Sequence, residues 1–280
     1  VFPNRSTYTA ILILDKKGRD YFYFKRIKKL STEFIAGAIN YLEYSNEAYA
    51  EQPWIFVSKE TEAIFDKVKN ANTVSLQAIS DITVGLQTSR NNVYIFKPHS
   101  ETEDTFIFSN DNTEYEIEKS ICKPCIYKLP FGLFDSVMPN AQMIFPYTIN
   151  DGKAEVFSED YFVENFPLTW AYLNNYKAIL VKRSINAPNP KWYQFGRTQS
   201  LTDFHNTDKL VWHVLSTKPT YILDTLNLQV TGGGNGPYYS LISRSDYSPL
   251  YILGILSHPL FEAMVKAGAD ILEIGVPFSD

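Results

Sequence analysis

Short runs of aromatic and β-branched residues recur along this chain, and proline or glycine repeatedly interrupts them. The sequence contains 19 Tyr, 19 Phe and 4 Trp. Such side chains pack well on a pleated, half-buried surface and are enriched in strands. Residues 105–108, 115–117 and 143–147 are examples of these runs. The pattern predicts an α+β fold that is rich in short strands.

The overall composition allows a substantial core. The 280 residues are 45% hydrophobic and 20% charged, which suits one large or two modest domains and argues against global disorder. The sequence shows no signal peptide and no apolar run of membrane length. We therefore expect a cytoplasmic protein that has no membrane partner.

The formal net charge of −5 does not favour a generally basic nucleic-acid binder. Acidic residues are concentrated in residues 101–104 and 111–118, however, which leaves other surfaces free to be locally basic. The two cysteines, Cys122 and Cys125, have no second cysteine pair, and the four histidines show no ligand spacing. We expect two free thiols and no metal site. A redox-active pair or half of a zinc site is the alternative.

The N-terminal residues predict a β-hairpin. Residues 6–15 and 21–27 have strand composition, and residues 16–20 between them have turn composition. A lone hairpin is marginal in water and needs a sheet to join, so we expect that this end is truncated. The basic residues 25–29 are interpreted as a solvated strand end. Residues 33–50 are weakly periodic and predict a helix or an irregular connector.

Four later segments predict regular structure. Residues 60–70 have the apolar spacing of an amphipathic helix, and residues 250–266 also indicate a helix. Residues 209–215 and 221–224 have strand patterns. The glycine-rich residues 232–237 lack the Lys-Ser/Thr ending of a phosphate loop, so we interpret them as a flexible hairpin tip.

Residues 82–96 predict a strand, a polar turn and a second strand. The turn supplies hydroxyls, a guanidinium and amides, which are the groups that contact phosphates and base edges in nucleic-acid complexes. The candidate binding residues are Thr88, Ser89, Arg90 and Asn91. A plain hairpin turn has the same composition, so that alternative stays open.

Residues 183–201 collect cations, aromatic rings, amides and hydroxyls on one segment, and two prolines and a glycine prevent a regular helix there. Residues 170–180 before it have near-helical apolar spacing and would support it. Arginine pairs bidentately with phosphates, amides read base edges, and aromatic rings stack on bases. The candidate binding residues are Arg183, Lys191, Trp192, Tyr193, Arg197 and Gln199. The alternative is a surface loop with a buried tryptophan, in which Arg183 pairs with a carboxylate such as Asp203.

Several short motifs follow one another in a fixed order. They are Gly85-Leu-Gln-Thr-Ser, Tyr172-Leu with Leu180 and Arg183, Trp192 to Arg197, Lys209-Leu-Val, Pro219 with Asp224, and Tyr251-Ile-Leu-Gly-Ile-Leu-Ser. This order resembles the C-terminal specificity domain of Taq-type adenine-N6 DNA methyltransferases and of the fused type IIG restriction-modification enzymes. The similarity covers residues 50–266, and residues 2–13 look like the last hairpin of the family's methyltransferase domain.

The resemblance implies a division of the chain into four parts. They are the end of a methyltransferase sheet (1–30), a connector (31–50), a DNA target-recognition domain (51–266) and a foreign-looking or peripheral tail (267–280). It also implies that the partner is duplex DNA and that the chain chooses the sequence in which an adenine is flipped. A methyltransferase catalytic domain in cis, in the full-length protein, would bind S-adenosylmethionine, and a nuclease can be fused to it.

This sequence departs from the family pattern in its chemistry. The family's cofactor loop and its Asn-Pro-Pro-Tyr/Phe tetrapeptide, which holds the flipped adenine, do not occur here. Residues 189–192 match the tetrapeptide only in part. We therefore expect that the chain itself neither binds S-adenosylmethionine nor methylates DNA, and we assign no catalytic residue.

Residues 262–280 are similar to one βα unit of the tryptophan synthase alpha subunit, in which Glu273 falls on the catalytic acid/base position. A single strand cannot form a barrel active site, so the tail is expected to be peripheral. Two other functions stay open: a protein-interaction domain without DNA binding, and a chimeric fragment with a piece of such a barrel. The DNA interpretation requires Arg90, Arg183, Lys191 and Arg197 to lie near one face.

Overall fold

The computed structural model describes residues 12–25, 41–47, 56, 60, 63, 67, 76–216, 218–232, 237–244 and 246–259. The chain divides into two units, Val1–Ala71 and Asn72–Asp280, which are treated separately below. Short, mostly antiparallel strands outnumber the helices in the described residues, so the predicted strand-rich α+β class is confirmed. The tail predicted to be peripheral, residues 267–280, lies outside the described residues. The four-part division of the chain stays a prediction.

The described part of the first unit is a small antiparallel pair. Strand β1 (Tyr21–Phe24) pairs with β2 (Leu42–Ser45), and Phe22 lies opposite Tyr44. The ring of Phe22 stacks on Tyr44 at 5.6 Å, and the ring of Phe24 lies 4.1 Å from that of Phe56. Alternate residues of β1 therefore turn towards one aromatic cluster, which is the period expected of a strand with one covered face.

This pairing corrects the predicted N-terminal hairpin. Residues 12–15 of the expected first strand have no strand structure, and β1 takes its partner from the segment predicted to be a connector. Aromatic side chains on residues 41–45 offer β1 a better apolar partner than the polar turn before it. Residues 6–11 and the basic residues 26–29 lie outside the described residues.

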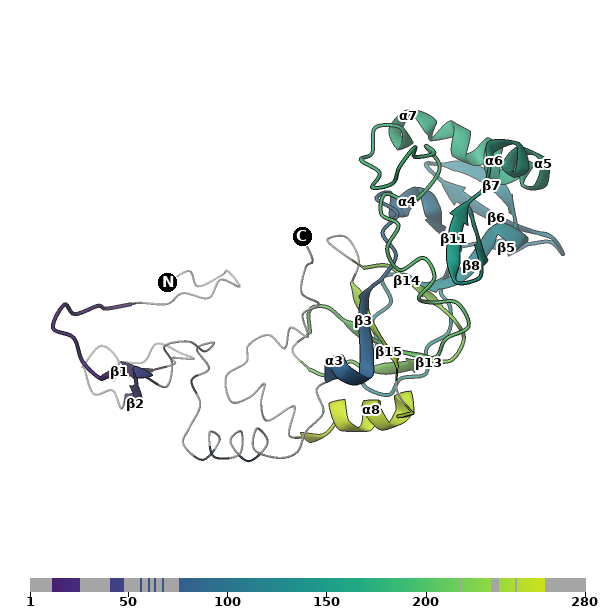
Figure 1. The fold of residues 1–280 in the computed structure, drawn as a ribbon. Helices are drawn as coiled ribbons and strands as arrows, with labels where there is room; N and C mark the ends of the chain where they lie inside the picture. Colours follow the sequence, from purple (N-terminus) through teal and green to yellow (C-terminus); the bar gives the residue numbers. More distant parts are fainter. Residues whose placement is uncertain are drawn as a thin grey trace. The chain divides into compact units, whose positions relative to one another are not determined.

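The second unit contains two four-stranded sheets, drawn in Figure 1. The first sheet is antiparallel and has the order β13–β12–β15–β3, with bounds Ile222–Asp224, Lys209–His213, Tyr238–Ser243 and Ser80–Val84. The second has the order β14–β8–β9–β4, with bounds Gln229–Val230, Cys122–Ile126, Ala141–Ile144 and Ile95–Phe96. The β14–β8 pair is parallel and the other pairs are antiparallel. The strands predicted near residues 209–215 and 221–224 are confirmed.

Helices and hairpins complete the unit. The three-stranded meander is β5–β6–β7 (Ser100–Glu101, Thr105–Asn110, Thr113–Glu118), and the separate hairpin is β10–β11 (Tyr147–Asn150, Lys153–Val156). The helices are α3 (Leu76–Ile79), α4 (Asn91–Tyr94), α5 (Glu159–Asn165), α6 (Pro167–Asn175), α7 (Lys177–Leu180) and α8 (Pro249–Leu256), with a 3₁₀ turn at Lys119–Ile121. None of the helices in the described residues has the length and apolar character that crossing a bilayer requires.

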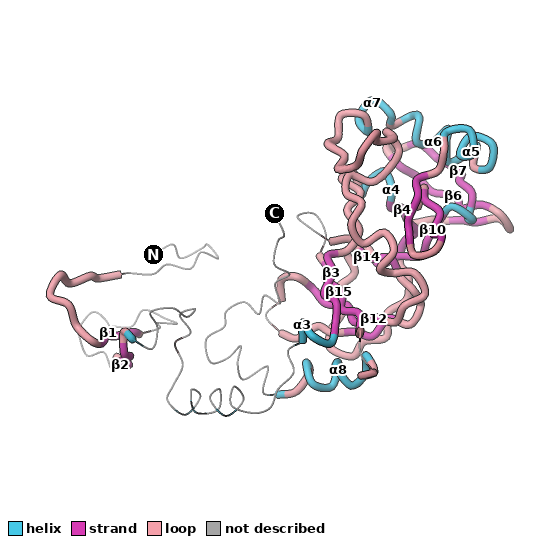
Figure 2. Tube along the Cα trace, viewed as in Figure 1, coloured by secondary structure: helices cyan, strands magenta, loops and turns pink. Residues whose placement is uncertain are grey.

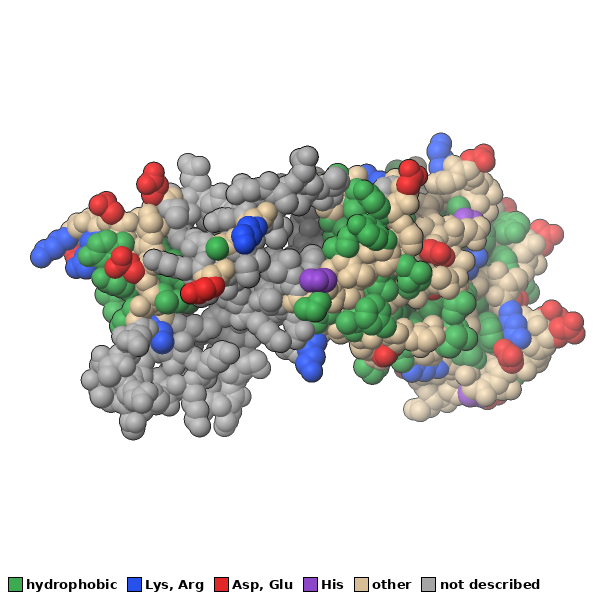
Figure 3. Space-filling model, turned by 90° about the horizontal axis from the view of Figure 1, so that it is seen from below, with side chains coloured by type: hydrophobic (Ala, Val, Ile, Leu, Met, Phe, Trp, Pro, Cys, Tyr) green, Lys and Arg blue, Asp and Glu red, His purple; other side chains and the backbone are tan. Residues whose placement is uncertain are grey.

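Helix α8 covers the first sheet. Ser248 accepts a hydrogen bond from the Leu250 amide, and Pro249 occupies the first helical turn, where its missing N–H costs nothing. Ile252 and Leu253 pack into a core cluster with Leu210 of β12. The opposite side of α8 is exposed, and hydrophobic side chains gather over this face in Figure 3. The predicted helix from residue 250 is thus confirmed as far as Leu256, and residues 260–266 lie outside the described residues.

A carboxylate fixes the start of α6. Glu118, at the end of β7, accepts hydrogen bonds from the Leu168 amide at 2.8 Å and from the Thr169 amide and hydroxyl at 2.9 Å and 2.6 Å. A negative charge at a helix N-terminus satisfies free N–H groups and favours the helix dipole. The tyrosine hydroxyl of Tyr172 then donates to the Val93 carbonyl at 2.8 Å. These bonds hold α6 against β7 and α4, and α6 and α7 are the helices predicted over residues 170–180.

Both cysteines lie in β8 and both are free thiols, as predicted. Cys125 is fully buried in the larger core, and Cys122 is partly buried. Burial raises the pKa of each thiol far above its ordinary value, because a thiolate is poorly solvated there. Inert thiols of this kind fill space and do not act as nucleophiles.

The hairpin predicted for residues 82–96 is wrong. Its first strand, β3, belongs to one four-stranded sheet, and its second strand, β4, belongs to the other. The segment between them passes close to another part of the backbone: a Cβ atom at Gly85 would lie 2.8 Å from the Gly232 nitrogen. Leu86 completes the crossing by donating from its amide to the Val230 carbonyl at 2.8 Å. Glycine at residue 85 permits this approach, and so the segment connects the two sheets.

Candidate nucleic-acid interface

The two segments that the sequence singled out lie directly against each other. The Gly196 amide donates to the Thr88 carbonyl and the Arg197 amide donates to the Gln87 carbonyl, both at 3.2 Å. Gly196 is packed so closely that a Cβ atom there would overlap the Ser89 side chain. Figure 2 shows these loops together beside the helices α4 and α7. The expectation that the polar turn and the 183–199 segment share one part of the surface is confirmed.

The turn is shaped by Thr88. Its side chain is fully buried, its hydroxyl donates to the Asn91 side-chain oxygen at 2.6 Å, and it accepts from the Arg90 amide at 3.0 Å. The Thr88 side chain therefore cannot reach a ligand, which corrects its assignment as a binding residue. Ser89 takes a left-handed backbone conformation, with φ of 58°, and is exposed together with Arg90. Asn91 is half-buried and begins α4.

Arg183 joins the two segments through hydrogen bonds beneath the surface. Its guanidinium donates to acceptors on the turn, on α4, on α7 and on its own segment. They are Thr88 O (2.6 Å), Tyr94 Oη (3.1 Å), Leu180 O (3.1 Å), Trp192 O (2.7 Å) and Gln194 O (2.9 Å). The guanidinium also lies over the Tyr94 ring, 5.3 Å from its centroid. Only arginine has a planar fork that can serve this many acceptors.

This arrangement gives Arg183 a structural role that neither sequence interpretation included. The guanidinium donates to backbone carbonyls and to the Tyr94 hydroxyl, so it positions other residues. The alternative ion pair with Asp203 is also absent, because Asp203 accepts from the Thr83 hydroxyl at 2.9 Å and no ion pair of Arg183 occurs in the described residues. Buried backbone carbonyls need donors, and Arg183 supplies them.

The aromatic residues of the segment are structural. Tyr193 is fully buried and donates its hydroxyl to the Phe157 carbonyl at 2.7 Å; burial, and secondarily the Glu159 charge, raise its pKa to about 12. Trp192 packs against Tyr193 and has the Lys177 ammonium 4.9 Å from its ring centroid. A ring must be open on one face to stack on a base. Tyr193 therefore cannot act as a stacking residue, which corrects that prediction. Trp192 is half-buried, and its assignment stays a prediction.

Tyr94 links the hydrogen bonds of Arg183 to the core, a role that the sequence did not predict. Its ring is fully buried, and burial raises its pKa to about 12 despite the opposing effect of Arg183. The hydroxyl therefore keeps its proton and donates to the Tyr193 carbonyl at 2.9 Å. A tyrosine inside an apolar run carries no local sign of this use. Its partner Arg183 lies far away in the sequence.

The side chains that remain available to a ligand come from these two joined segments and are here named the recognition surface: Ser89, Arg90, Lys191, Arg197 and Gln199. All five are exposed. The three cationic side chains form no hydrogen bond or ion pair with any residue that the structure describes. Because no carboxylate neutralises them, they offer positive charge and donors on an irregular, backbone-anchored surface.

Comparison with known proteins gives one relative of the chain. No protein-family model matches the chain. Over 290 residues the chain is 27% identical to the type II restriction enzyme and methyltransferase RM.Eco57I of Escherichia coli. The chain resembles a restriction-modification enzyme. The alignment covers 97% of this chain and 29% of RM.Eco57I, so the chain spans less than a third of that protein.

Proposed function

We propose that the chain recognises duplex DNA for a restriction-modification adenine-N6 methyltransferase, and that the recognition surface contacts the DNA. The observation that carries this proposal is the joining of the polar turn to the 183–199 segment, because these segments carry three exposed cations that have no ion pair within the described residues. Arg197 is the central residue, because its backbone is held by Gln87 while its guanidinium is free of described partners. The similarity to RM.Eco57I supports the same enzyme class.

Each part of the recognition surface has a role in this proposal. Arg90, Lys191 and Arg197 neutralise phosphates or, for the arginines, read a guanine edge, while Ser89 and Gln199 donate to phosphate or base atoms. Asn91 lies at the edge of the surface. Trp192, Tyr193, Thr88 and Arg183 hold these groups in place. The methyltransferase domain of the full-length protein positions the target adenine and binds S-adenosylmethionine.

A salt series of duplex binding tests the proposal. The full chain is first used to select duplexes from a random pool, and the selected duplex is titrated at several salt concentrations. If Arg197 contacts a phosphate, the variant Arg197→Ala should bind the duplex more weakly than the wild type. The salt slope, which is the slope of log affinity against log salt concentration, should then be smaller by about one. If Arg197 reads a base instead, about 1–3 kcal/mol of discrimination is lost at one base position. Lys153→Ala, an exposed lysine in β11, is the matched control and should leave both quantities unchanged.

The outcome that contradicts the proposal is equally definite. If Arg197→Ala and Arg90→Ala both bind the selected duplex as the wild type does, with the same salt slope, the recognition surface is not a DNA interface. Stoichiometric binding of S-adenosylmethionine to the chain, measured by titration calorimetry, would contradict the proposed division of labour with the methyltransferase domain.

A further inference from the structure

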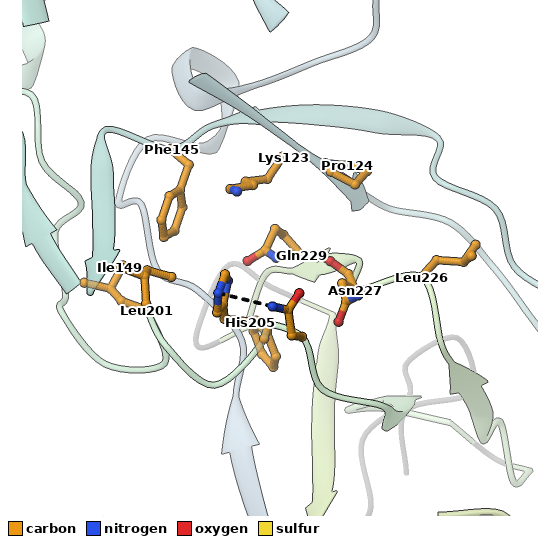
Figure 4. Close-up of a pocket in the computed structure, with 11 residues that line it drawn as sticks. Lys123, Pro124, Phe145, Ile149, Leu201, His205, Leu226, Asn227 and Gln229 are labelled. Atoms are coloured by element: carbon orange, nitrogen blue, oxygen red, sulfur yellow. Dashed lines mark hydrogen bonds between the residues drawn. The ribbon is translucent and has the colours of Figure 1, made fainter. Parts of the chain in front are cut away.

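A cavity of about 180 Å³ opens beside the second sheet, at the ends of two loops (Figure 4). Its walls come from β8, from Phe145, from the loop after the recognition surface, and from the loop that joins β13 to β14. The lining residues are Lys123, Pro124, Phe145, Ile149, Leu201, Phe204, His205, Asn206, Leu226, Asn227 and Gln229. One lysine and three side-chain amides are among them, and the lining contains no carboxylate.

A buried ion pair fixes the loop that forms one wall of the cavity. Lys209 is fully buried and its ammonium donates to the carboxylate of Asp224. The same carboxylate accepts from the Leu226 amide at 2.8 Å and from the Leu228 amide at 2.9 Å, so it sets the course of the loop between β13 and β14. A charge pair satisfied in this way inside the core is rigid, because moving it would expose an unpaired charge to an apolar surrounding.

A second bond ties the two loops together. The Asn227 side-chain oxygen accepts from the Thr207 amide at 2.8 Å, and Asn227 itself has a left-handed backbone with φ of 56°. The Thr207 hydroxyl in turn donates to the His205 carbonyl at 3.0 Å. The cavity therefore has its shape before any ligand enters, and preformed sites lose less entropy on binding.

Two polar side chains of the lining, Gln229 and Lys123, face the cavity. Gln229 is only 6% exposed; its amide nitrogen donates to the Asn227 carbonyl at 3.2 Å, whereas its amide oxygen accepts no bond from a described residue. Figure 4 shows this amide in the middle of the cavity, below the ammonium of Lys123. That ammonium also has no hydrogen bond or ion pair within the described residues. The Gln229 amide oxygen and the Lys123 ammonium are therefore open to the cavity and available to a ligand.

We propose that this cavity binds a single nucleobase, supplied by an unstacked nucleotide of the DNA that the recognition surface holds. The volume corresponds to about six waters at ~30 Å³ each, too large for a lone ion and below the ~300 Å³ of typical drug-sized sites. The apolar side chains Phe145 and Leu201 provide a surface for a flat ring, and the amides of Asn227 and Gln229 carry donors and acceptors suited to a base edge.

The location of the cavity fits DNA as the source of the base. Leu201 follows Arg197 by 201 − 197 = 4 residues, so the cavity begins within about 14 Å of the recognition surface along an extended chain. Lys123 at its edge adds a cation for the phosphate of the same nucleotide. This inference rests on the proposed function, since the nucleotide comes from the bound duplex.

Nuclear magnetic resonance of the full, isotope-labelled chain tests the cavity on its own. The probes are dAMP, dGMP, dCMP and dTMP at millimolar concentration, and inorganic phosphate. We expect at least one nucleotide to shift the side-chain amide signals of Asn227 and Gln229, and Gln229→Leu to weaken its binding about tenfold by removing one hydrogen bond. Arg197→Ala should bind the nucleotide as the wild type does. The proposal would be overturned if inorganic phosphate shifted these signals as much as a nucleotide does, or if none of the four nucleotides shifted them.

A second measurement identifies the source of the base. The selected duplex carries 2-aminopurine at successive positions, because the fluorescence of this analogue rises when it leaves the stack. We expect a rise at one position, lost with Gln229→Leu while most of the duplex affinity remains. Nucleotide binding without any such rise would overturn DNA as the source. If the 2-aminopurine fluorescence does not rise and Arg197→Ala also leaves the salt slope unchanged, the proposed function is contradicted as well. Failure of the cavity proposal alone can therefore be told apart from failure of the proposed function.

Discussion

Two regions of the second unit each depend on an internal cation, and they use it in opposite ways. Beneath the recognition surface, Arg183 donates to uncharged carbonyl and hydroxyl oxygens from several segments. Behind the cavity, Lys209 meets one carboxylate, that of Asp224. A guanidinium distributes its charge over a planar fork, whereas an ammonium is a compact point charge that needs a counter-ion when buried.

The difference determines the charge that each region shows to a ligand. Arg183 is not neutralised, so its positive charge adds to the potential created by Arg90, Lys191 and Arg197 although it makes no contact of its own. Lys209 is neutralised by Asp224, and the cavity owes its positive character to Lys123. A protein with a net charge of −5 can in this way present a local cationic surface. Counting basic residues along the sequence does not separate these roles.

The largest expected effect tests the charged pair. Asp224→Asn keeps the shape of the side chain but leaves the Lys209 ammonium buried without a counter-ion. We expect the free energy of unfolding, measured with urea, to fall by about 3–5 kcal/mol. The double variant Lys209→Met/Asp224→Asn should recover much of this loss, because no buried charge is then left unpaired.

An exposed carboxylate provides the control for that experiment. Asp135 accepts from the Gly132 amide at 2.7 Å at the surface, and Asp135→Asn should cost about 0.5 kcal/mol or less. If Asp224→Asn is as mild as Asp135→Asn, the cavity wall does not depend on an ion pair and the contrast with Arg183 disappears.

Arg183→Lys tests the other side of the comparison. Lysine keeps the positive charge but cannot reach the Thr88, Trp192 and Gln194 carbonyls together, so several carbonyls lose their donor. We expect a loss of about 2–4 kcal/mol in the free energy of unfolding, from several bonds of about 1 kcal/mol each. Arg197→Lys is the matched control and should change stability by less than about 0.5 kcal/mol. Equal small effects would mean that charge alone matters at residue 183.

A smaller effect is expected where the two segments touch. Gly196→Ala places a methyl group against the Ser89 side chain and should cost about 1–3 kcal/mol through overpacking. The rescue is Ser89→Gly, which removes the obstructing side chain and also suits the left-handed backbone at residue 89. Thermal denaturation of both single variants and of the double variant measures the coupling. A double variant that is no more stable than Gly196→Ala would show that the contact is not the cause.

Local patterns in the sequence predicted much of the secondary structure but not its pairing. The aromatic and β-branched runs gave the strand class, and β12, β13 and α8 lie close to where they were predicted. The prediction of a hairpin over residues 82–96 was wrong. The alternation of apolar and polar residues shows which face of a strand is buried, but it does not show which strands are its neighbours. β3 pairs with β15, which lies far along the chain. Such pairing depends on the packing of the whole unit.

The candidate site was predicted to a similar extent. The sequence singled out two segments that meet in the structure, since cations, amides and prolines mark irregular surface segments. It could not separate the exposed Arg197 from the internal Arg183, because both are arginines in polar surroundings and only burial distinguishes their use. The apolar run around Tyr193 did indicate burial, and its interpretation as a stacking surface gave that signal too little weight. Gln229 had no distinguishing local pattern.

The smallest expected effect concerns a group on the cavity side of the comparison that must stay uncharged. His213, at the end of β12, stacks on Phe131 with ring centroids 4.2 Å apart, and its Nε2 atom accepts from the Phe131 amide at 3.4 Å. Burial lowers its pKa below the ordinary value of about 6.5. Between those two pKa values the unfolded chain binds more protons than the folded chain, so stability rises with pH.

His213 should therefore contribute a loss of stability as the pH falls below about 6.5, by less than the ~1.4 kcal/mol per pH unit that one whole proton would give. Urea denaturation at a series of pH values, comparing the wild type with His213→Gln, isolates this contribution: the variant should show a shallower decline between pH 6.5 and the lowered pKa, and no difference in slope above it. His205→Gln, which removes an exposed histidine at the cavity rim, should retain the wild-type slope. If the His213 and His205 variants decline alike, neutral packing of His213 at the end of β12 does not stabilise this region.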